Sequence, residues 1–354
     1  MTSLERVQLA LSHHKPDRTP RLLYEEAVGY TPAIAELLKK KCAPRSPLEY
    51  FQMDIAGVSA LPSRLGPSRF AAWQPVQAFD AGQVDEWGVW WKSGSVHHFR
   101  HIESPLRAAT DVRQIKEYPW PDVDELYRYE GLAEKVQSLH RRGLAVCALP
   151  PSIFEQAWYL RSFEQMLMDM LADPDIAQLL LQRTSYYQRK AAEAFTRAGV
   201  DIIITGDDVA NQKSLMMSAE VWRRLLKPLQ TATARAVKAI NPAVKVFYHC
   251  DGNVEPLIPD LIETGIDILN PIQPECMDPA RIKAQFGDRL SFWGTVSVQR
   301  TMCLGTPEEV KAEVRQRINT VGRGGGFILA PAHVLGPETP WENIQAFFEA
   351  ADEG

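Results

Sequence analysis

One stretch of the chain places side chains that can bind metal or transfer protons directly after an apolar run. The run is Val244–Tyr248, and His249, Cys250 and Asp251 follow it. Because side chains alternate along a strand, His249 and Asp251 would point to one face and Cys250 to the other. The His249–Asp251 pair could bind a metal or act in acid–base chemistry. Alternatively, the histidine only hydrogen-bonds its neighbours and the aspartate only begins a turn.

Polar groups also follow six other apolar runs. They are Tyr24-Glu25-Glu26, Pro150-Pro151-Ser152, Thr205-Gly206-Asp207-Asp208, Asn270-Pro271-Ile272-Gln273, Gly294-Thr295-Val296-Ser297 and Pro331-Ala332-His333. The carboxyl ends of the strands meet at one mouth in a parallel barrel, so we predict a ligand site there. The expected mouth is acidic, and crowded carboxylates raise one another's pKa or recruit a cation. A metal, a cationic substrate or a proton-transfer pair would suit it, whereas a multiply anionic substrate would not.

The order of apolar runs and helical patterns indicates the fold class. We expect eight strands at 21–24, 55–61, 144–149, 201–204, 244–248, 266–269, 290–293 and 326–329. We expect helices at 3–14, 31–41, 46–52, 123–142, 152–171, 173–198, 219–240, 254–264, 279–286, 307–321 and 340–351. Strands that alternate with helices predict parallel pairing. The count of eight favours a single (β/α)8 TIM barrel over residues 1–354, with an open doubly wound sheet as the alternative.

Residues 63–104 interrupt this alternation with aromatic residues and short polar–apolar repeats. This pattern predicts antiparallel hairpins, which form either a wall over the site or an edge ribbon without ligand contacts. The fold expected from sequence is therefore a barrel with an N-terminal helical and hairpin insertion.

Composition narrows the classes of partner. The 354 residues carry 39 Lys plus Arg against 44 Asp plus Glu, and no basic stripe that would follow a nucleic-acid backbone is evident. No apolar run is long enough to span a bilayer, and no signal-peptide core follows Met1, so we expect a cytoplasmic protein. The five cysteines are odd in number and include no CxxC pair, which suggests reduced thiols rather than disulfides.

Several ordered fragments resemble the uroporphyrinogen decarboxylase superfamily. They are Asp17-Arg18-Thr19-Pro20, Asp85-Glu86-Trp87-Gly88, Gly206-Asp207-Asp208, His249-Cys250-Asp251-Gly252, Gly265-Ile266-Asp267-Ile268-Leu269-Asn270-Pro271, Phe292-Trp293-Gly294 and the stretch from Gly324 to His333. The resemblance implies a (β/α)8 barrel with an open cleft at its carboxyl face, and a homodimer. In the decarboxylase, two arginines of the first-strand motif receive tetrapyrrole propionates. Glu25 and Gly29 stand at those positions here, so uroporphyrinogen is not the expected substrate.

The corrinoid-linked methyltransferase branch looks closer. Its members resemble this chain at a His-x-Cys-Gly motif and a late Pro-Gly-Cys, which supply one histidine and two cysteines to zinc. His249 matches the histidine, while Asp251 and His333 occupy the cysteine positions. Two histidines and a carboxylate are also a catalytic zinc pattern, and this harder set suits water or an alkoxide better than a thiolate.

We therefore expect a methyltransferase that moves a methyl group between a small substrate and a corrinoid protein or another acceptor. No cobalamin-binding Asp-x-His-x-x-Gly segment occurs in the chain, so the corrinoid would arrive on a separate partner. The alternatives are a metal-free decarboxylase or lyase for a small non-tetrapyrrole acid, and a non-catalytic binding barrel.

The site residues expected from sequence fall into three groups. The catalytic candidates are His249, Asp207, Asp208 and Glu25; the substrate-binding candidates are Tyr24, Glu26, Trp87, Gln273 and Trp293; the zinc ligands are His249, Asp251 and His333, with Cys276 less favoured. Packing in the core or hairpins is the alternative for the tryptophans and Gln273, and packing in a loop is the alternative for Cys276.

Overall fold

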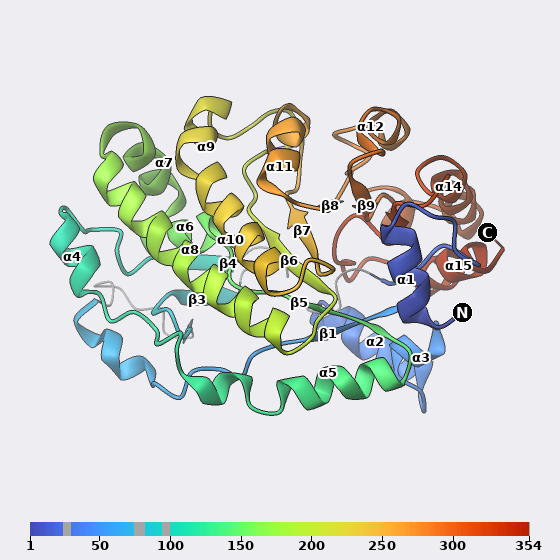
Figure 1. Cartoon of the computed structure of the whole chain (residues 1–354), viewed down its shortest axis with the longest axis horizontal. Helices are drawn as coiled ribbons and strands as arrows, with labels where there is room; N and C mark the ends of the chain where they lie inside the picture. The colour runs from blue at the N-terminus through green and yellow to red at the C-terminus, as the bar shows by residue number, and fades with distance from the viewer. Residues whose placement is uncertain (24–29, 74–81, 94–99, 354) are drawn as a thin grey trace.

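The computed structural model describes residues 1–23, 30–73, 82–93 and 100–353. Seven strands of this part form one curled parallel sheet in the order β1-β5-β6-β7-β8-β9-β10 (Figure 1). Their bounds are β1 Ile55–Val58, β5 Ala145–Ala148, β6 Ile202–Gly206, β7 Lys245–His249, β8 Ile268–Asn270, β9 Ser291–Trp293 and β10 Phe327–Ile328. Helices follow the strands, as the alternating pattern predicted.

The expected strand over 21–24 is the exception. Among the described residues it is reduced to an isolated parallel bridge between Arg21 and Leu329. The backbone N–H of Leu22 donates to the Leu329 carbonyl (3.1 Å), and the N–H of Leu329 donates to Pro20 (2.8 Å). On the other side, the N–H of Asp54 donates to the Arg21 carbonyl (3.0 Å). Residues 20–22 therefore join β10 to the segment that leads into β1.

The α-helices of the described chain have these bounds: α1 Ser3–Leu11, α2 Pro32–Cys42, α3 Pro47–Tyr50, α4 Val112–Glu117, α5 Leu132–Arg141, α6 Phe154–Arg161, α7 Phe163–Ala172, α8 Pro174–Arg197, α9 Ala219–Leu225, α10 Lys227–Ile240, α11 Ile258–Thr264, α12 Pro279–Phe286, α13 Thr301–Leu304, α14 Pro307–Thr320 and α15 Trp341–Asp352. Short 3₁₀ helices lie at Pro67–Trp73, Leu126–Tyr129 and Glu255–Leu257. None of the helices found in the described ranges is long and apolar enough to cross a membrane.

Three of the predicted helices are divided by local backbone chemistry. The one expected over 152–171 breaks at Ser162, which has a positive φ of 78°. The one over 219–240 restarts at Lys227, because Pro228 lacks the N–H that an unbroken helix would use. The one over 123–142 is split at Gly131, whose φ is 70°. Apolar periodicity locates a helix but does not detect these breaks.

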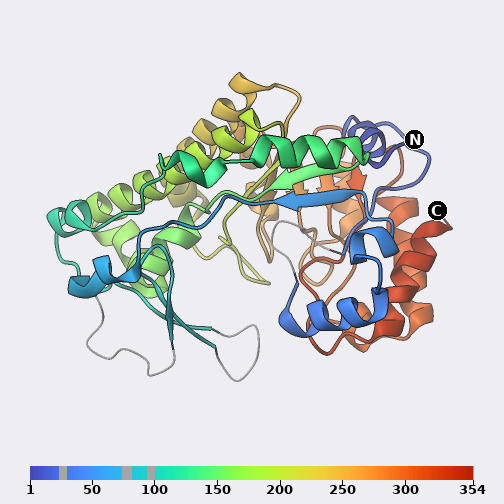
Figure 2. The ribbon, with the colours of Figure 1, turned by 90° about the horizontal axis from the view of Figure 1, so that it is seen from below.

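Antiparallel strands occupy part of the range for which we predicted hairpins. β2 (Gln83–Val84), β3 (Trp90–Ser93) and β4 (Arg100–Glu103) form a separate three-stranded sheet between β1 and β5 in the chain. Figure 2 shows this sheet extending away from the parallel one. Its β3 residue Trp91 contacts Tyr159 of α6 edge to face, with ring centroids 5.0 Å apart. This contact ties the small sheet to a helix that follows the parallel strand β5.

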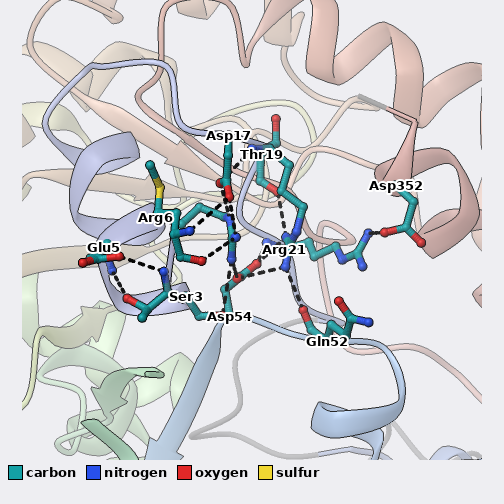
Figure 3. Close-up of polar contacts among 12 residues, drawn as sticks. Ser3, Glu5, Arg6, Asp17, Thr19, Arg21, Gln52, Asp54 and Asp352 are labelled. Atoms are coloured by element: carbon teal, nitrogen blue, oxygen red, sulfur yellow. Dashed lines mark hydrogen bonds and ion pairs between the residues drawn. The ribbon is translucent and has the colours of Figure 1, made fainter. Parts of the chain in front are cut away.

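A buried ion-pair network lies at the amino ends of the strands (Figure 3). The Asp54 side chain is fully buried and accepts hydrogen bonds from Arg6 of α1 (2.6 Å) and from Arg18 (2.7 Å). Asp54 also accepts from the backbone N–H of Arg21 (2.9 Å). The Arg6 guanidinium holds the pKa of Asp17 down at about 2. Asp54 thus connects α1, the segment that bridges the sheet edges and the start of β1.

Replacing Asp54 with asparagine leaves the two arginines without their buried carboxylate. We expect Asp54→Asn to lower the free energy of unfolding by about 3–5 kcal/mol, because removing one partner of a buried pair leaves uncompensated charge. Denaturant unfolding followed by circular dichroism measures this change. The control is Asp288→Asn, whose side chain is 76% exposed and which should change stability by less than about 0.5 kcal/mol. Equal effects of the two substitutions would contradict the role assigned to Asp54.

Candidate functional site

Three metal-ligating side chains converge from two distant segments at the carboxyl ends of the strands. His249 ends β7, Asp251 lies two residues later, and His333 follows β10. The His249 Nε2 lies 3.8 Å from Asp251 Oδ1, and the His333 Nε2 lies 3.5 Å from Asp251 Oδ2. One donor atom from each residue lies within 4.8 Å of the other two. The structure therefore brings together the three residues predicted as zinc ligands.

Gly252 lets the loop that carries Asp251 approach its neighbour closely. Its φ is +83°, and a Cβ at this position would collide with the backbone of Asn211. The N–H of Asn253 donates to the Asn211 carbonyl (2.8 Å), and the N–H of Gly252 donates to Gln273 Oε1 (3.1 Å). Gln273, predicted to bind substrate, is buried and holds this loop in place.

Asn270 orients the imidazole of His249. The Asn270 Nδ2 donates to the Trp293 carbonyl (2.8 Å), so its Oδ1 faces His249 Nδ1 at 2.6 Å. An amide oxygen can only accept, so Nδ1 carries the proton and, in the neutral ring, Nε2 keeps a lone pair. Gly294 permits this arrangement, because a Cβ there would lie 2.8 Å from Asn270 Nδ2.

The lone pair of His249 thus faces other electron-rich atoms. Asp251 is 3.8 Å away, and Asp208 Oδ1 is 3.6 Å from the same Nε2. Asp208 accepts from the N–H of Asp251 (2.7 Å), which ties the two acidic residues together. Burial raises the pKa of Asp208, while the charge of His249 opposes that rise. A bound cation or a protonated imidazole would each relieve the repulsion.

Asp207 is directed into the protein rather than toward this cluster. Its side chain is fully buried and accepts from the backbone N–H groups of Phe154 (2.5 Å) and Glu155 (3.0 Å), and from Gln230 Nε2 (2.9 Å). Burial raises its pKa to about 7. We predicted a catalytic role for Asp207, but a buried carboxylate that binds the first turn of α6 is placed to position that helix instead of touching substrate.

Glu155 is an acidic residue close to Asp207 and Asp208 that sequence reasoning missed. It lies in the first turn of α6, seven residues past the end of β5, and burial together with the charges of Asp208 and Asp207 raises its pKa to about 8. The residues predicted at the end of this strand extended only to Ser152, three residues earlier. Asn270 stood among the strand-end residues, but its role depends on contacts with His249 and Trp293 that no sequence spacing reveals.

The remaining predicted residues are dispersed. Trp293 is fully buried and packs edge-on against Phe247, with centroids 5.1 Å apart, so it lies in the core rather than in a cleft wall. Trp87 is likewise buried, and its ring packs against Tyr187 at 4.7 Å. Cys276 is not part of the metal-ligating group found among the described residues, and burial raises its pKa to about 11. The predicted residues Tyr24, Glu25 and Glu26 lie outside the described residues.

Comparison with known proteins identifies the family of the chain. A model of the uroporphyrinogen decarboxylase (URO-D) family matches residues 89–354. The chain belongs to the uroporphyrinogen decarboxylase family. The fold agrees as well: a solved methyltransferase from Methanosarcina mazei superposes over 100% of this chain and 99% of its own, with a TM-score of 0.71 at 20% identity.

Some curated relatives within the family are named methyltransferases and others are named decarboxylases. A methylcobamide:CoM methyltransferase MtaA of Methanosarcina barkeri is 32% identical over 46% of this chain and 44% of its own length. A uroporphyrinogen decarboxylase of Coxiella burnetii is 22% identical over 96% of this chain and 92% of its own length. The chain thus spans less than half the length of this methyltransferase and nearly all of the decarboxylase.

The raised pKa of Asp207 predicts a stability that depends on pH. The folded protein holds the Asp207 proton up to a pKa of about 7, while the unfolded chain releases it near the ordinary aspartate pKa of 3.8. The folded state therefore binds more protons between these values, and its stability falls as pH rises through this window. We expect Asp207→Asn, which keeps an acceptor for the α6 backbone, to flatten that fall. The denaturant midpoints of unfolding at pH 5 and pH 7.5 measure this fall in stability. The same fall in the wild type and in Asp207→Asn would contradict the raised pKa assigned to Asp207.

Proposed function

We propose that this member of the uroporphyrinogen decarboxylase family is a methyltransferase that moves a methyl group between a small substrate and a corrinoid carried by a separate protein. The observation that carries the proposal is the convergence of His249, Asp251 and His333, whose ligand atoms lie within 4.8 Å of one another. The methyltransferase names of the Methanosarcina relatives support the same reading.

The residues present fit a zinc ion. Two neutral imidazole nitrogens and a carboxylate form a three-residue set typical of catalytic zinc, with a further position left for substrate. The hydrogen bond from His249 Nδ1–H to Asn270 Oδ1 is the kind of outer contact that orients a histidine ligand. When bound, zinc would supply Lewis-acid chemistry, and a nitrogen and oxygen set favours an oxygen-containing substrate over a thiol.

The protein's own groups would position the substrate and control protons. Asn270 holds the His249 ring, and Gln273 and Asn211 hold the loop that presents Asp251. Asp208 supplies a negative charge beside the same histidine.

We also propose that residues 20–22 occupy the eighth strand position of a (β/α)8 barrel, and that the protein is a homodimer.

Metal content tests the proposed zinc site directly. We expect about one zinc per chain in the purified protein, and loss of most of it in His249→Ala and in His333→Ala, since each substitution removes one of three protein ligands. Elemental analysis by mass spectrometry measures it. The control is His14→Ala, an exposed histidine in the loop after α1, which should keep its zinc. Zinc retained in both site variants would show that these histidines are not ligands.

Methyl transfer tests the reaction. We expect zinc-loaded protein, mixed with a methylated oxygen compound and a reduced corrinoid, to give methylcorrinoid, which is followed by its visible absorption. His333→Ala should slow the reaction at least about 100-fold, because a ligand is lost. A panel of methyl ethers and methanol is the first set of substrates to assay.

The second candidate is a metal-independent decarboxylase for a small acid. The nearly full-length similarity to the Coxiella burnetii decarboxylase favours it. His249 and Asp208, 3.6 Å apart, would then serve as the proton-transfer pair. Glu25 and Gly29 stand where the decarboxylase motif carries its arginines, which disfavours uroporphyrinogen itself. Purified protein without zinc, together with release of CO₂ from a small carboxylic acid, would decide for this candidate.

A further inference from the structure

We propose that Asp208 is the positioning residue of the metal-ligating group. Its side chain holds the backbone N–H of Asp251 and so decides where the Asp251 carboxylate meets His249 and His333, while Asp208 itself stays outside the coordination of the metal. The inference rests on the proposed metal site and adds to it the residue that fixes the place of one ligand.

Two carboxylates lie at similar distances from the same imidazole nitrogen. The Nε2 of His249 is 3.6 Å from Asp208 Oδ1 and 3.8 Å from Asp251 Oδ1. Asp251 also approaches the Nε2 of His333 with its second oxygen, Oδ2, at 3.5 Å. The group of metal-ligating atoms that the described residues form, all within 4.8 Å of one another, contains Asp251 and does not contain Asp208. Asp251 is therefore the better placed ligand, which leaves a different role for Asp208.

The Asp208 oxygen that faces His249 also accepts a hydrogen bond from the loop that carries the ligand. The backbone N–H of Asp251 donates to Asp208 Oδ1 at 2.7 Å. This distance is at the short end of the range for N–H···O bonds. Because the bond fixes the backbone nitrogen of the ligand residue, the place of the Asp251 carboxylate then depends on rotation about its own side-chain bonds.

The next two N–H groups of the loop are held as well. Gly252 donates to Gln273 Oε1 (3.1 Å), and Asn253 donates to the carbonyl of Asn211 (2.8 Å). Gln273 follows β8, whereas Asn211 and Asp208 follow β6, and these two strands flank β7 in the sheet. The loop is therefore tethered from both sides. Of these three tethers, the bond to Asp208 is the one made by the ligand residue itself.

The backbone on either side of Asp208 is fixed in turn. The preceding residue, Asp207, is fully buried, and its N–H donates to the carbonyl of His249 (3.0 Å). The following residue, Val209, is also fully buried, and its N–H donates to the Sγ of Cys250 (3.4 Å). Both bonds join the segment after β6 to the end of β7. Asp208 thus reaches the ligand loop from a rigid base, as a side chain that positions a ligand must.

Two substitutions separate the hydrogen bond from the charge. Asp208→Asn keeps an oxygen that can accept the Asp251 N–H, whereas Asp208→Ala removes it. We expect Asp208→Ala to weaken zinc binding about 30-fold and Asp208→Asn to weaken it about fivefold or less, because loss of an outer contact typically costs a metal site about 10–100-fold in affinity. Competition with a chromophoric zinc chelator measures the affinity. The control is Asp288→Ala, whose side chain is 76% exposed and which should bind zinc as the wild type does.

Cobalt(II) in place of zinc reports the coordination of the metal rather than its affinity. Four-coordinate cobalt(II) absorbs visible light much more strongly than six-coordinate cobalt(II). We expect the wild type and Asp208→Asn to share one intense spectrum. Asp208→Ala should give a weaker one, because water replaces the Asp251 ligand once its backbone is released. A general loss of stability would lower the amount of bound cobalt but would not change the spectrum of what is bound.

The outcomes separate this inference from the proposed function. Wild-type protein that binds no zinc overturns the proposed metal site and this inference with it. Zinc binding by the wild type, with an unchanged affinity in Asp208→Ala or with equal losses in the alanine and asparagine variants, overturns the positioning role and leaves the zinc site standing. If Asp208→Ala does not fold, Asp208→Ser takes its place with the same expectation, because its hydroxyl is one bond shorter than the carboxylate.

Discussion

Crowding of electron-rich groups at the carboxyl ends of β6 and β7 is the constraint on which the site depends. Asp208 Oδ1 and Asp251 Oδ1 lie 3.6 and 3.8 Å from the Nε2 of His249, and His333 approaches Asp251 from a segment more than 80 residues away. Acceptors at such distances repel one another unless a cation or a proton lies between them. The backbone bonds of the Asp251 loop, rather than attraction between the side chains, hold the cluster together.

The two ends of the sheet carry charge in opposite ways. At the amino ends, buried Asp54 is matched by arginine guanidinium groups and a backbone N–H, so its charge is compensated and serves stability. At the carboxyl ends, Asp207, Asp208 and Glu155 all have a raised pKa. Uncompensated acids are costly to bury, and functional sites are where such groups concentrate.

Membership in the uroporphyrinogen decarboxylase family accounts for the scaffold but not for the chemistry. Relatives named as methyltransferases and as decarboxylases match the same chain, so the side chains at the strand ends have to distinguish the two. In the function proposed above, the set of two histidines and one carboxylate would hold a metal that acts on an oxygen-containing substrate.

Sequence alone was enough to predict the parallel α/β architecture and the meeting of His249, Asp251 and His333, because apolar runs mark strands and parallel strands share one carboxyl edge. Only the tertiary structure decided the direction of each side chain. Asp207 and Asp208 are neighbours in the chain, yet one is bound by α6 and α10 and the other faces His249. Trp293, predicted in the cleft, packs in the core. The bond between the backbone N–H of Glu155 in α6 and Asp207 could not be predicted, because helix packing and long-range hydrogen bonds leave no periodic pattern in the sequence.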